Sequence, residues 1–270
     1  MSLDAIAYSI VVELAATQVI KRLPLLSHAL HAQVLTWIGA ADAELAQTLH
    51  QTQVSPLSIS PLLGKSARRT IQAGDRLYFR VGVLASSYAQ ALLKGIEQGG
   101  DAPLVFNEQP FKIVGVLTLP GSHKLAGATP YTLLHQTPAA KTITLQLRSP
   151  TSFKQGKKDI QPLPLPELVF NSLQRRWNAF APEDLRFTPI EWHGRVSAYD
   201  LKTHRLTIKK STEIGAQGRI SYEFPDPDQA KRAAVLAQFA FFAGVGRKTA
   251  LGMGQVLKDE GRRQKDERLA

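Results

Sequence analysis

The chain has 270 residues, of which 44% are hydrophobic, and it carries a formal net charge of +11 at pH 7. This length and apolar content suffice for one large domain or two domains of roughly 130 residues each. Because cysteine is absent, disulfides, thiolate chemistry and cysteine-based zinc sites are excluded. The surplus of Lys and Arg favours a polyanionic partner, although charge alone fits an ordinary basic protein equally well.

The N-terminal segment is not typical of a targeting sequence. It begins MSLDAIAYSI, with an acidic residue ahead of the apolar run, and Glu13 interrupts that run. Nowhere does the sequence approach the roughly 20 apolar residues of a membrane span. We therefore expect a cytoplasmic protein without a membrane partner.

The first half alternates between strand and helix periodicity. In chain order we expect a strand at 4–14, a helix at 27–50 broken near Gly39, strands at 57–63 and 76–84, a helix capped by Ser86 or Ser87 and ended at Gly99 and Gly100, and a strand at 110–119. This β-α-β-β-α-β order is the ferredoxin-like unit.

The second half repeats the pattern after a segment containing Gly and Pro. The expected elements are a strand at 142–149, a helix at 165–180, several short strands in 190–224 with an extra hairpin around 196–210, a helix from the Asp226-Pro227 cap to about Phe242, and a strand near 254–257. The fold class predicted is α+β, with two tandem ferredoxin-like (RRM-like) domains. We expect these domains at 1–120 and 141–258, a linker at 121–140, and a polar, disordered tail at 259–270.

A glycine-rich loop follows the last predicted helix. Glycine adopts positive φ at low cost and lets backbone approach another chain closely, so such a loop can present N–H groups to phosphates. The glycines and the two cations that we expect to bind RNA here are Gly244, Gly246, Arg247, Lys248, Gly252 and Gly254. The alternative is an ordinary tight turn between a helix and a strand.

Two familiar phosphate-binding loops do not fit this segment. A P-loop needs glycine followed directly by lysine, but Arg247 separates Gly246 from Lys248. The dinucleotide fingerprint needs a third glycine where Thr249 stands, and it should follow a strand rather than a helix.

The loop instead matches the pattern Gly-h-Gly-x5-Gly-h-Gly, where h is hydrophobic. This pattern resembles the loop of the RAMP superfamily, and specifically of the CRISPR repeat-cleaving endoribonucleases, the sixth Cas family. The segments 145–156 and 164–180 resemble the opening of that family's second domain, and 42–51 resembles the place of its catalytic histidine. The resemblance implies metal-independent cleavage of repeat RNA by its 2′-OH, leaving 5′-OH and 2′,3′-cyclic phosphate ends. Non-cleaving relatives share the loop.

Metal-free cleavage needs a general base, a general acid and a group that offsets charge on the phosphorane. Histidine can fill either proton-transfer role near neutral pH. His28, His31 and His50 lie in the first helical region, and the resemblance places the family's histidine at His50. We expect His31 to assist it. For each of them, a surface or helix-end histidine is the alternative. No helical His-x3-His pair occurs, and we expect neither a metal nor another cofactor.

The catalytic helper departs from the family's pattern, in which a tyrosine and a lysine often accompany the histidine. Here no Tyr, Lys or Arg occurs between Leu23 and Gly64. The candidate helpers are therefore His31, a serine near Ser55, or Lys154 from the second half.

Further basic residues are expected to bind the RNA backbone, although any such cluster is equally an ordinary solvated face. They are Lys157, Lys158, Arg175 and Arg176, the last two on the polar side of the 165–180 helix. An A-form stem is recognised mainly through shape, 2′-OH groups and phosphates, so a CRISPR repeat stem-loop suits these cations. Other CRISPR effector subunits and a second copy of the chain are further candidate partners.

Three hypotheses follow from the sequence. The first is a repeat-processing endoribonuclease, and the second is a non-catalytic RAMP-type RNA-binding subunit of a CRISPR effector complex. The third is a generic basic RNA chaperone, which would bind unrelated hairpins as tightly as a repeat.

Overall fold

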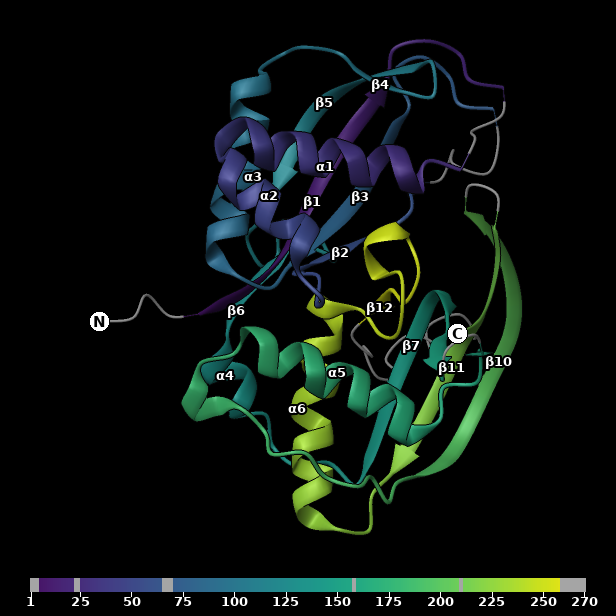
Figure 1. Cartoon of the computed structure of the whole chain (residues 1–270). Coiled ribbons are helices and arrows are strands. Elements are labelled where there is room, and N and C mark those ends of the chain that lie inside the picture. Colours follow the sequence, from purple (N-terminus) through teal and green to yellow (C-terminus); the bar gives the residue numbers. More distant parts are fainter. Residues whose placement is uncertain (1–4, 22–24, 65–69, 157–158, 209–210, 258–270) are drawn as a thin grey trace, which may run out of the picture.

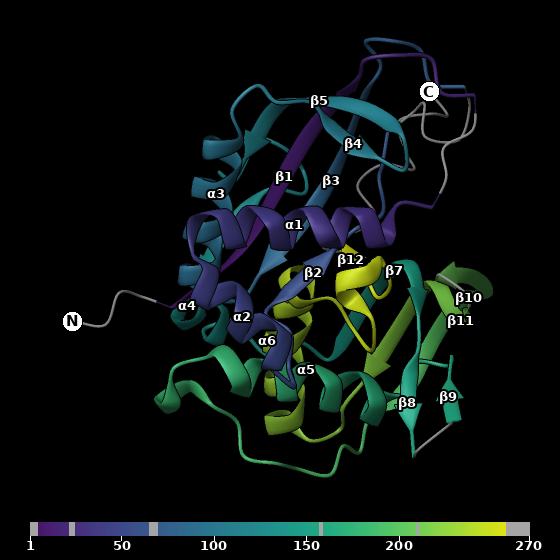
Figure 2. The same cartoon turned by 45° about the horizontal axis from the view of Figure 1, so that its top comes forward.

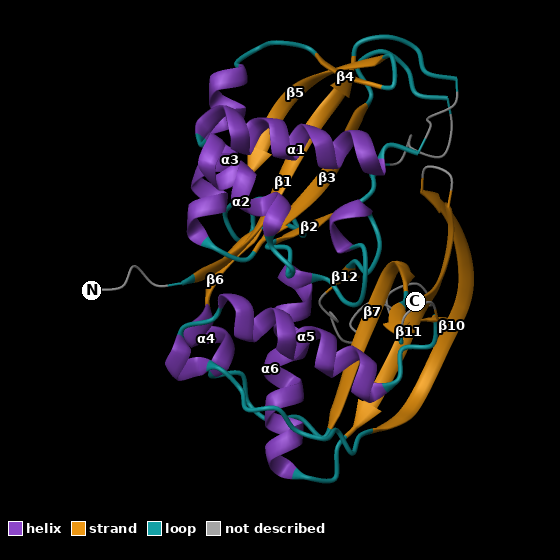
Figure 3. Ribbon diagram, in the orientation of Figure 1, coloured by secondary structure: helices purple, strands orange, loops and turns teal. Residues whose placement is uncertain are grey.

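The computed structural model describes residues 5–21, 25–64, 70–156, 159–208 and 211–257. The chain forms two α+β units in chain order, with the C-terminal glycine-rich loop between them (Figure 1). Figure 3 shows that each unit places helices against one antiparallel sheet.

In the N-terminal unit, helices cover an antiparallel sheet. Its elements are β1 (Ile6–Ala16), α1 (Ser27–Ala41), α2 (Ala43–Gln51), β2 (Leu57–Ile59), β3 (Arg76–Val83), α3 (Ser86–Gly99), β4 (Leu104–Phe106), β5 (Gln109–Leu117), β6 (Gly127–Pro130) and α4 (Tyr131–His135). The strand order is β2-β3-β1-β5-β4, and β6 extends the same edge of β1 that β5 occupies.

Both faces of β1 are buried. Side chains alternate between the faces of a strand, so Ile10 and Val12 pack in the core beneath α1 and α3. Ala7 and Val11 point to the opposite face and join the core of the C-terminal unit. Burial on both sides explains why this strand is almost continuously apolar.

The C-terminal unit repeats the topology. Its elements are β7 (Thr142–Thr151), β8 (Phe153–Gln155), β9 (Asp159–Gln161), α5 (Pro166–Phe180), the short 3-10 turn η2 (Glu183–Leu185), β10 (Arg195–Ile208), β11 (Ser211–Glu223), α6 (Pro227–Ala243), a second 3-10 turn η3 (Thr249–Leu251) and β12 (Val256–Leu257). The sheet order is β10-β11-β7-β12, and β8 and β9 form a separate hairpin beside it (Figure 2). In both units the first strand lies between the third and fourth strands of the β-α-β-β-α-β order.

Two helix boundaries follow directly from local sequence. Asp42 ends α1 and caps α2, because its carboxylate accepts a hydrogen bond from the Leu45 amide at 2.8 Å. Asp226 caps α6 by accepting from two amides, those of Asp228 and Gln229. The predicted cap of α3 is wrong, since Ala85 occupies the N-cap position without a side-chain hydrogen bond.

The extra hairpin predicted around 196–210 is also wrong. Residues 195–208 instead form one long strand, β10, which pairs along its length with β11. β10 lies at the edge of its sheet and has one neighbouring strand, so its many polar side chains remain in water. A run of polar residues is typical of a turn, but here it belongs to an extended edge strand.

The segment 121–140, which the sequence indicates as a linker, is largely ordered. It holds β6 and α4, and Leu125 and Ala126 are buried. The Tyr131 hydroxyl donates to the Leu84 carbonyl at 3.0 Å, and the ring packs edge-on against Trp177 of α5. This segment therefore packs against both units. The predicted disordered tail at 259–270 lies outside the described residues.

Candidate nucleic-acid interface

All four glycines of the loop adopt positive φ, at 69°, 78°, 90° and 65° for Gly244, Gly246, Gly252 and Gly254. Close packing adds a second constraint at two of them. A Cβ on Gly246 would lie 2.4 Å from the Ser152 carbonyl oxygen, and one on Gly254 would lie 2.0 Å from the Val245 carbonyl oxygen. The glycines are thus required by the loop's own conformation and packing.

The glycine amides mostly point into the protein. The N–H of Gly244 donates to the Ala240 carbonyl at 2.8 Å, and that of Gly254 donates to the Pro150 carbonyl at 3.0 Å. The N–H of Gly246 donates to the Ser172 hydroxyl at 3.1 Å. The expectation that these three amides cradle a phosphate is therefore wrong, because each already has an acceptor.

The two cations of the loop share one carboxylate. Lys248 has a left-handed conformation, with φ of 54°, and it caps the turn η3. Both Arg247 and Lys248 form ion pairs with Glu213 of β11, whose residue is 7% exposed. Burial raises the pKa of Glu213, but the hydrogen bond from Lys248 and the charges of the two cations outweigh it and hold that pKa below its usual value. The three groups together keep one net positive charge.

Arg176 is a buried connector between the two units. Its residue is 4% exposed, and its guanidinium donates to the Ala243 carbonyl and, at 2.8 Å, to the Thr249 hydroxyl. It also donates to the carbonyls of Ser55 and Leu57, at 3.0 and 3.1 Å, in the N-terminal unit. Burial lowers its pKa to about 10. The prediction that Arg176 lies on a polar helix face for RNA is wrong, because this face of α5 meets the other unit.

A second buried arginine, Arg80 of β3, lies at the same junction. It donates to the Phe241 carbonyl and, at 2.6 Å, to the Gln255 side-chain oxygen. The Gln255 side-chain amide in turn donates to the Ser58 hydroxyl at 3.0 Å and to the Ile59 carbonyl at 3.2 Å. One arginine from each unit thus bonds to carbonyls in the last turn of α6, where cations are favoured.

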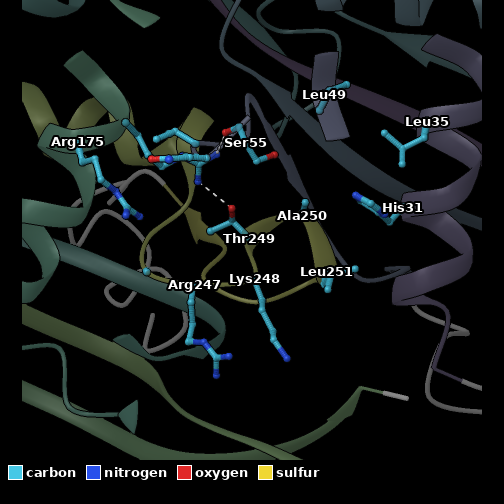
Figure 4. Close-up of a pocket in the computed structure, with 14 residues that line it drawn as sticks. His31, Leu35, Leu49, Ser55, Arg175, Arg247, Lys248, Thr249, Ala250 and Leu251 are labelled. Carbon is cyan, nitrogen blue, oxygen red and sulfur yellow. Dashed lines mark hydrogen bonds between the residues drawn. The ribbon is translucent and has the colours of Figure 1, made fainter. Parts of the chain in front are cut away.

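A pocket of about 450 Å³ opens where the units meet. The residues that line it come from α1, the end of α2 and the segment that follows it, α5 and the loop. They are His31, Leu35, Leu49, Gln53, Val54, Ser55, Arg175, Arg176, Gly246, Arg247, Lys248, Thr249, Ala250 and Leu251. Figure 4 shows His31 pointing from α1 toward the loop, while Arg247 and Lys248 extend side by side from the loop, away from Ser55. A histidine and cations from opposite ends of the chain therefore line one cavity.

The other predicted catalytic residues have different places. His50 lies near the end of α2, between residues that line the pocket, but its side chain is outside the described part of the structure. Lys154 is exposed on β8 and is not among the residues that line the pocket. Of the other predicted RNA-binding cations, exposed Arg175 lines the pocket, whereas Lys157 and Lys158 lie outside the described residues.

Sequence reasoning missed two residues that shape this interface. Glu213 lies in a segment whose alternation predicts only a strand. Nothing in that alternation indicates that Arg247 and Lys248, 34 and 35 residues away, are its partners. Thr249 departs from the dinucleotide fingerprint, and the sequence does not indicate that its hydroxyl accepts a hydrogen bond from Arg176. Both roles depend on contacts between distant segments.

Comparison with known proteins shows which families this chain is similar to. The family model described as CRISPR-associated endoribonuclease Cas6 matches residues 145–256. The CRISPR-associated endoribonuclease Cas6 of Mycobacterium tuberculosis is 24% identical over 223 residues, which cover 79% of this chain and 66% of the relative. The match thus spans slightly less than two thirds of that curated relative.

Among solved structures, a Cas6 product complex has a TM-score of 0.81 at 25% identity, covering 93% of this chain and 99% of that chain. The chain is Cas6-like. Thermus thermophilus Cas6 has a TM-score of 0.72 at 25% identity, with 93% and 98% covered. An RAMP protein binding different RNA substrates shares the Cas6-like fold at 16% identity, with a TM-score of 0.59 and with 93% and 98% covered. The resemblance and the tandem ferredoxin-like fold predicted from the sequence are confirmed.

One further observation concerns membranes. In the described part of the chain, none of the helices has the 18-residue apolar window that a bilayer span requires.

Proposed function

We propose that this protein is an endoribonuclease that processes CRISPR repeat RNA. The observation that carries the proposal is the pocket between the units, where His31 faces a loop with two cations. Similarity to Cas6 endoribonucleases in sequence and in structure supports the same activity. The likeness supports the reaction class, and residues in and beside the pocket are the candidates for its catalytic roles.

The proposed reaction is attack of a ribose 2′-OH on the adjacent phosphate without a metal ion. One histidine takes the proton from the 2′-OH, and a second proton donor protonates the departing 5′ oxygen. We assign the principal proton transfer to His50 and the assisting role to His31. The bond between phosphorus and the 5′ oxygen breaks as the bond between the 2′ oxygen and phosphorus forms. The products are a 2′,3′-cyclic phosphate end and a 5′-OH end.

Charge on the phosphorane needs a nearby cation. Arg175, Arg247 and Lys248 line the pocket, so we propose them as the groups that bind the RNA phosphates. Lys154 is less suited, because it is exposed on β8 outside that lining. A repeat stem-loop is the proposed substrate, whereas association with effector subunits or with a second copy of the chain stays a prediction.

The decisive experiment incubates the purified protein with repeat RNA in EDTA. We expect one cut, and mass spectrometry of the fragments should find a 2′,3′-cyclic phosphate and a 5′-OH. A substrate with a 2′-deoxy sugar at the cut site should bind and remain whole, because the nucleophile is missing. Binding of the unmodified repeat without any cut would favour the non-catalytic RNA-binding subunit, and equal binding of unrelated hairpins would favour a generic RNA chaperone.

A further inference from the structure

The guanidinium of Arg176 joins three segments that are far apart in the chain. It donates to the end of α6 at Ala243, to the glycine-rich loop at Thr249, and to the carbonyls of Ser55, which follows α2, and Leu57, which begins β2. A dashed line in Figure 4 marks the bond to the Thr249 hydroxyl, which is 2.8 Å long. The residue is buried, so water does not compete for these acceptors.

Two of these segments line the pocket from different units. Ser55 belongs to the stretch that follows α2, the helix that carries His50, and it lines the cavity together with Gln53. Thr249 directly follows Lys248 in the loop and lines the cavity from the other unit. Arg176 bonds to both walls, and the Thr249 hydroxyl also donates to the Leu57 carbonyl at 3.5 Å, so the separation of the two walls is set at this point.

Arginine suits this task for a geometric reason. Its guanidinium is planar and presents donors in a fixed fork, so the directions to its acceptors are fixed together. Lysine has a single nitrogen with three donors on a flexible stem and could not hold the same acceptors in place. The acceptors are neutral carbonyls and a hydroxyl, so they do not neutralise the buried cation. Burial of an unpaired charge costs free energy of folding, which favours a functional role for the residue.

We infer that Arg176 is a positioning residue for the proposed cleavage, acting through Thr249 and the segment after α2 rather than by contact with RNA. It holds the wall that follows the histidine-bearing helix at a fixed separation from the cations that bind the phosphate. The inference rests on the proposed function. Its consequence is kinetic, because displacement of reacting groups by about 1 Å can slow a reaction by about 10²-fold while binding contacts persist.

The test uses Thr249, where a small change removes one bond of Arg176 together with the 3.5 Å bond from the Thr249 hydroxyl to the Leu57 carbonyl. Thr249→Val deletes the hydroxyl at nearly constant size, and Thr249→Ser retains it. We expect Thr249→Val to slow single-turnover cleavage of repeat RNA by about tenfold or more, with Kd changed by less than about threefold. Thr249→Ser should cleave at nearly the normal rate. Arg176→Lys, which keeps the charge but loses the fork, should resemble Thr249→Val or exceed it.

Thr144→Val is the matched control. It also removes a threonine hydroxyl that shares a hydrogen bond, here with Ser221 at 2.9 Å on the C-terminal sheet, and it should leave cleavage unchanged. Thermal unfolding of each variant identifies a protein that has lost its fold. Equal rates for Thr249→Val and the unchanged protein, or a parallel loss of affinity and rate, would overturn the inference alone. Failure of the unchanged protein to cut repeat RNA would instead overturn the proposed function and this inference with it.

Discussion

Glu213 of β11 and Lys248 of the glycine-rich loop form an ion pair across 35 residues of sequence. Arg247 pairs with the same carboxylate, and the side chains of both cations are about one quarter exposed. The carboxylate therefore reduces the charge that the loop offers to an RNA phosphate. It also holds two like charges side by side, which would otherwise repel each other.

Replacing Glu213 tests how that carboxylate affects RNA binding. Glu213→Gln removes one negative charge beside the loop, so we expect repeat RNA to bind roughly three- to tenfold more tightly at low salt, with a smaller gain as salt rises. Filter binding across a salt series measures this effect. Glu223→Gln is the control, since Glu223 lies on the same strand and pairs with exposed Arg195 at 2.8 Å. Weaker binding by Glu213→Gln would mean that the carboxylate chiefly orients the cations.

The pH dependence of stability gives a second test of the same ion pairs. The folded-state pKa of Glu213 is lowered, because the two cations outweigh the effect of burial. Its contribution to stability is therefore present above the ordinary value of 4.5 and is lost as the pH falls through the folded-state pKa. The free energy of unfolding should differ more between the unchanged protein and Glu213→Gln at neutral pH than in acid. Urea titrations at both pH values measure the difference, and a larger difference in acid would contradict this sign.

Phosphate binding by the loop predicts a change in salt dependence. Each phosphate contact that is lost should lower the slope of log K against log salt by roughly one. We therefore expect Arg247→Ala and Lys248→Ala each to weaken repeat binding and to flatten this slope. Lys112→Ala is the control, because Lys112 pairs with Asp101 at 3.5 Å on the surface of the N-terminal unit. An unchanged affinity and slope in both loop variants would make the loop purely structural.

The histidines should control rate rather than affinity. A positioned general acid or base contributes about 10²–10⁴ in rate, so His50→Ala should slow cleavage by that factor and leave repeat binding nearly intact. His31→Ala should have a smaller effect in the same assay. His204→Ala, which changes an exposed histidine of β10, should cleave normally. If His50→Ala cuts at the normal rate, His31 becomes the first candidate, and if neither change matters the non-cleaving subunit is favoured.

Local sequence patterns predict most of the helices and strands of the fold, and they identify the glycine-rich loop. Strand and helix periodicities, the Asp226 cap and the doubled β-α-β-β-α-β order depend on residues that are close in the chain. The loop is recognisable because two Gly-x-Gly triplets bracket five residues that include two cations. The hairpin predicted at 196–210 is wrong, because a polar edge strand and a turn have the same composition.

Packing between distant segments sets which charges face the pocket and which are buried. Arg175 and Arg176 are neighbours in one helix, yet the first is exposed and the second bonds to carbonyls 119 and 121 residues away. The pairing of Glu213 with the loop and the position of His31 opposite it likewise arise from packing between units. The physical reason is that local sequence sets backbone preferences, whereas burial and charge pairing depend on which distant segment covers each side chain.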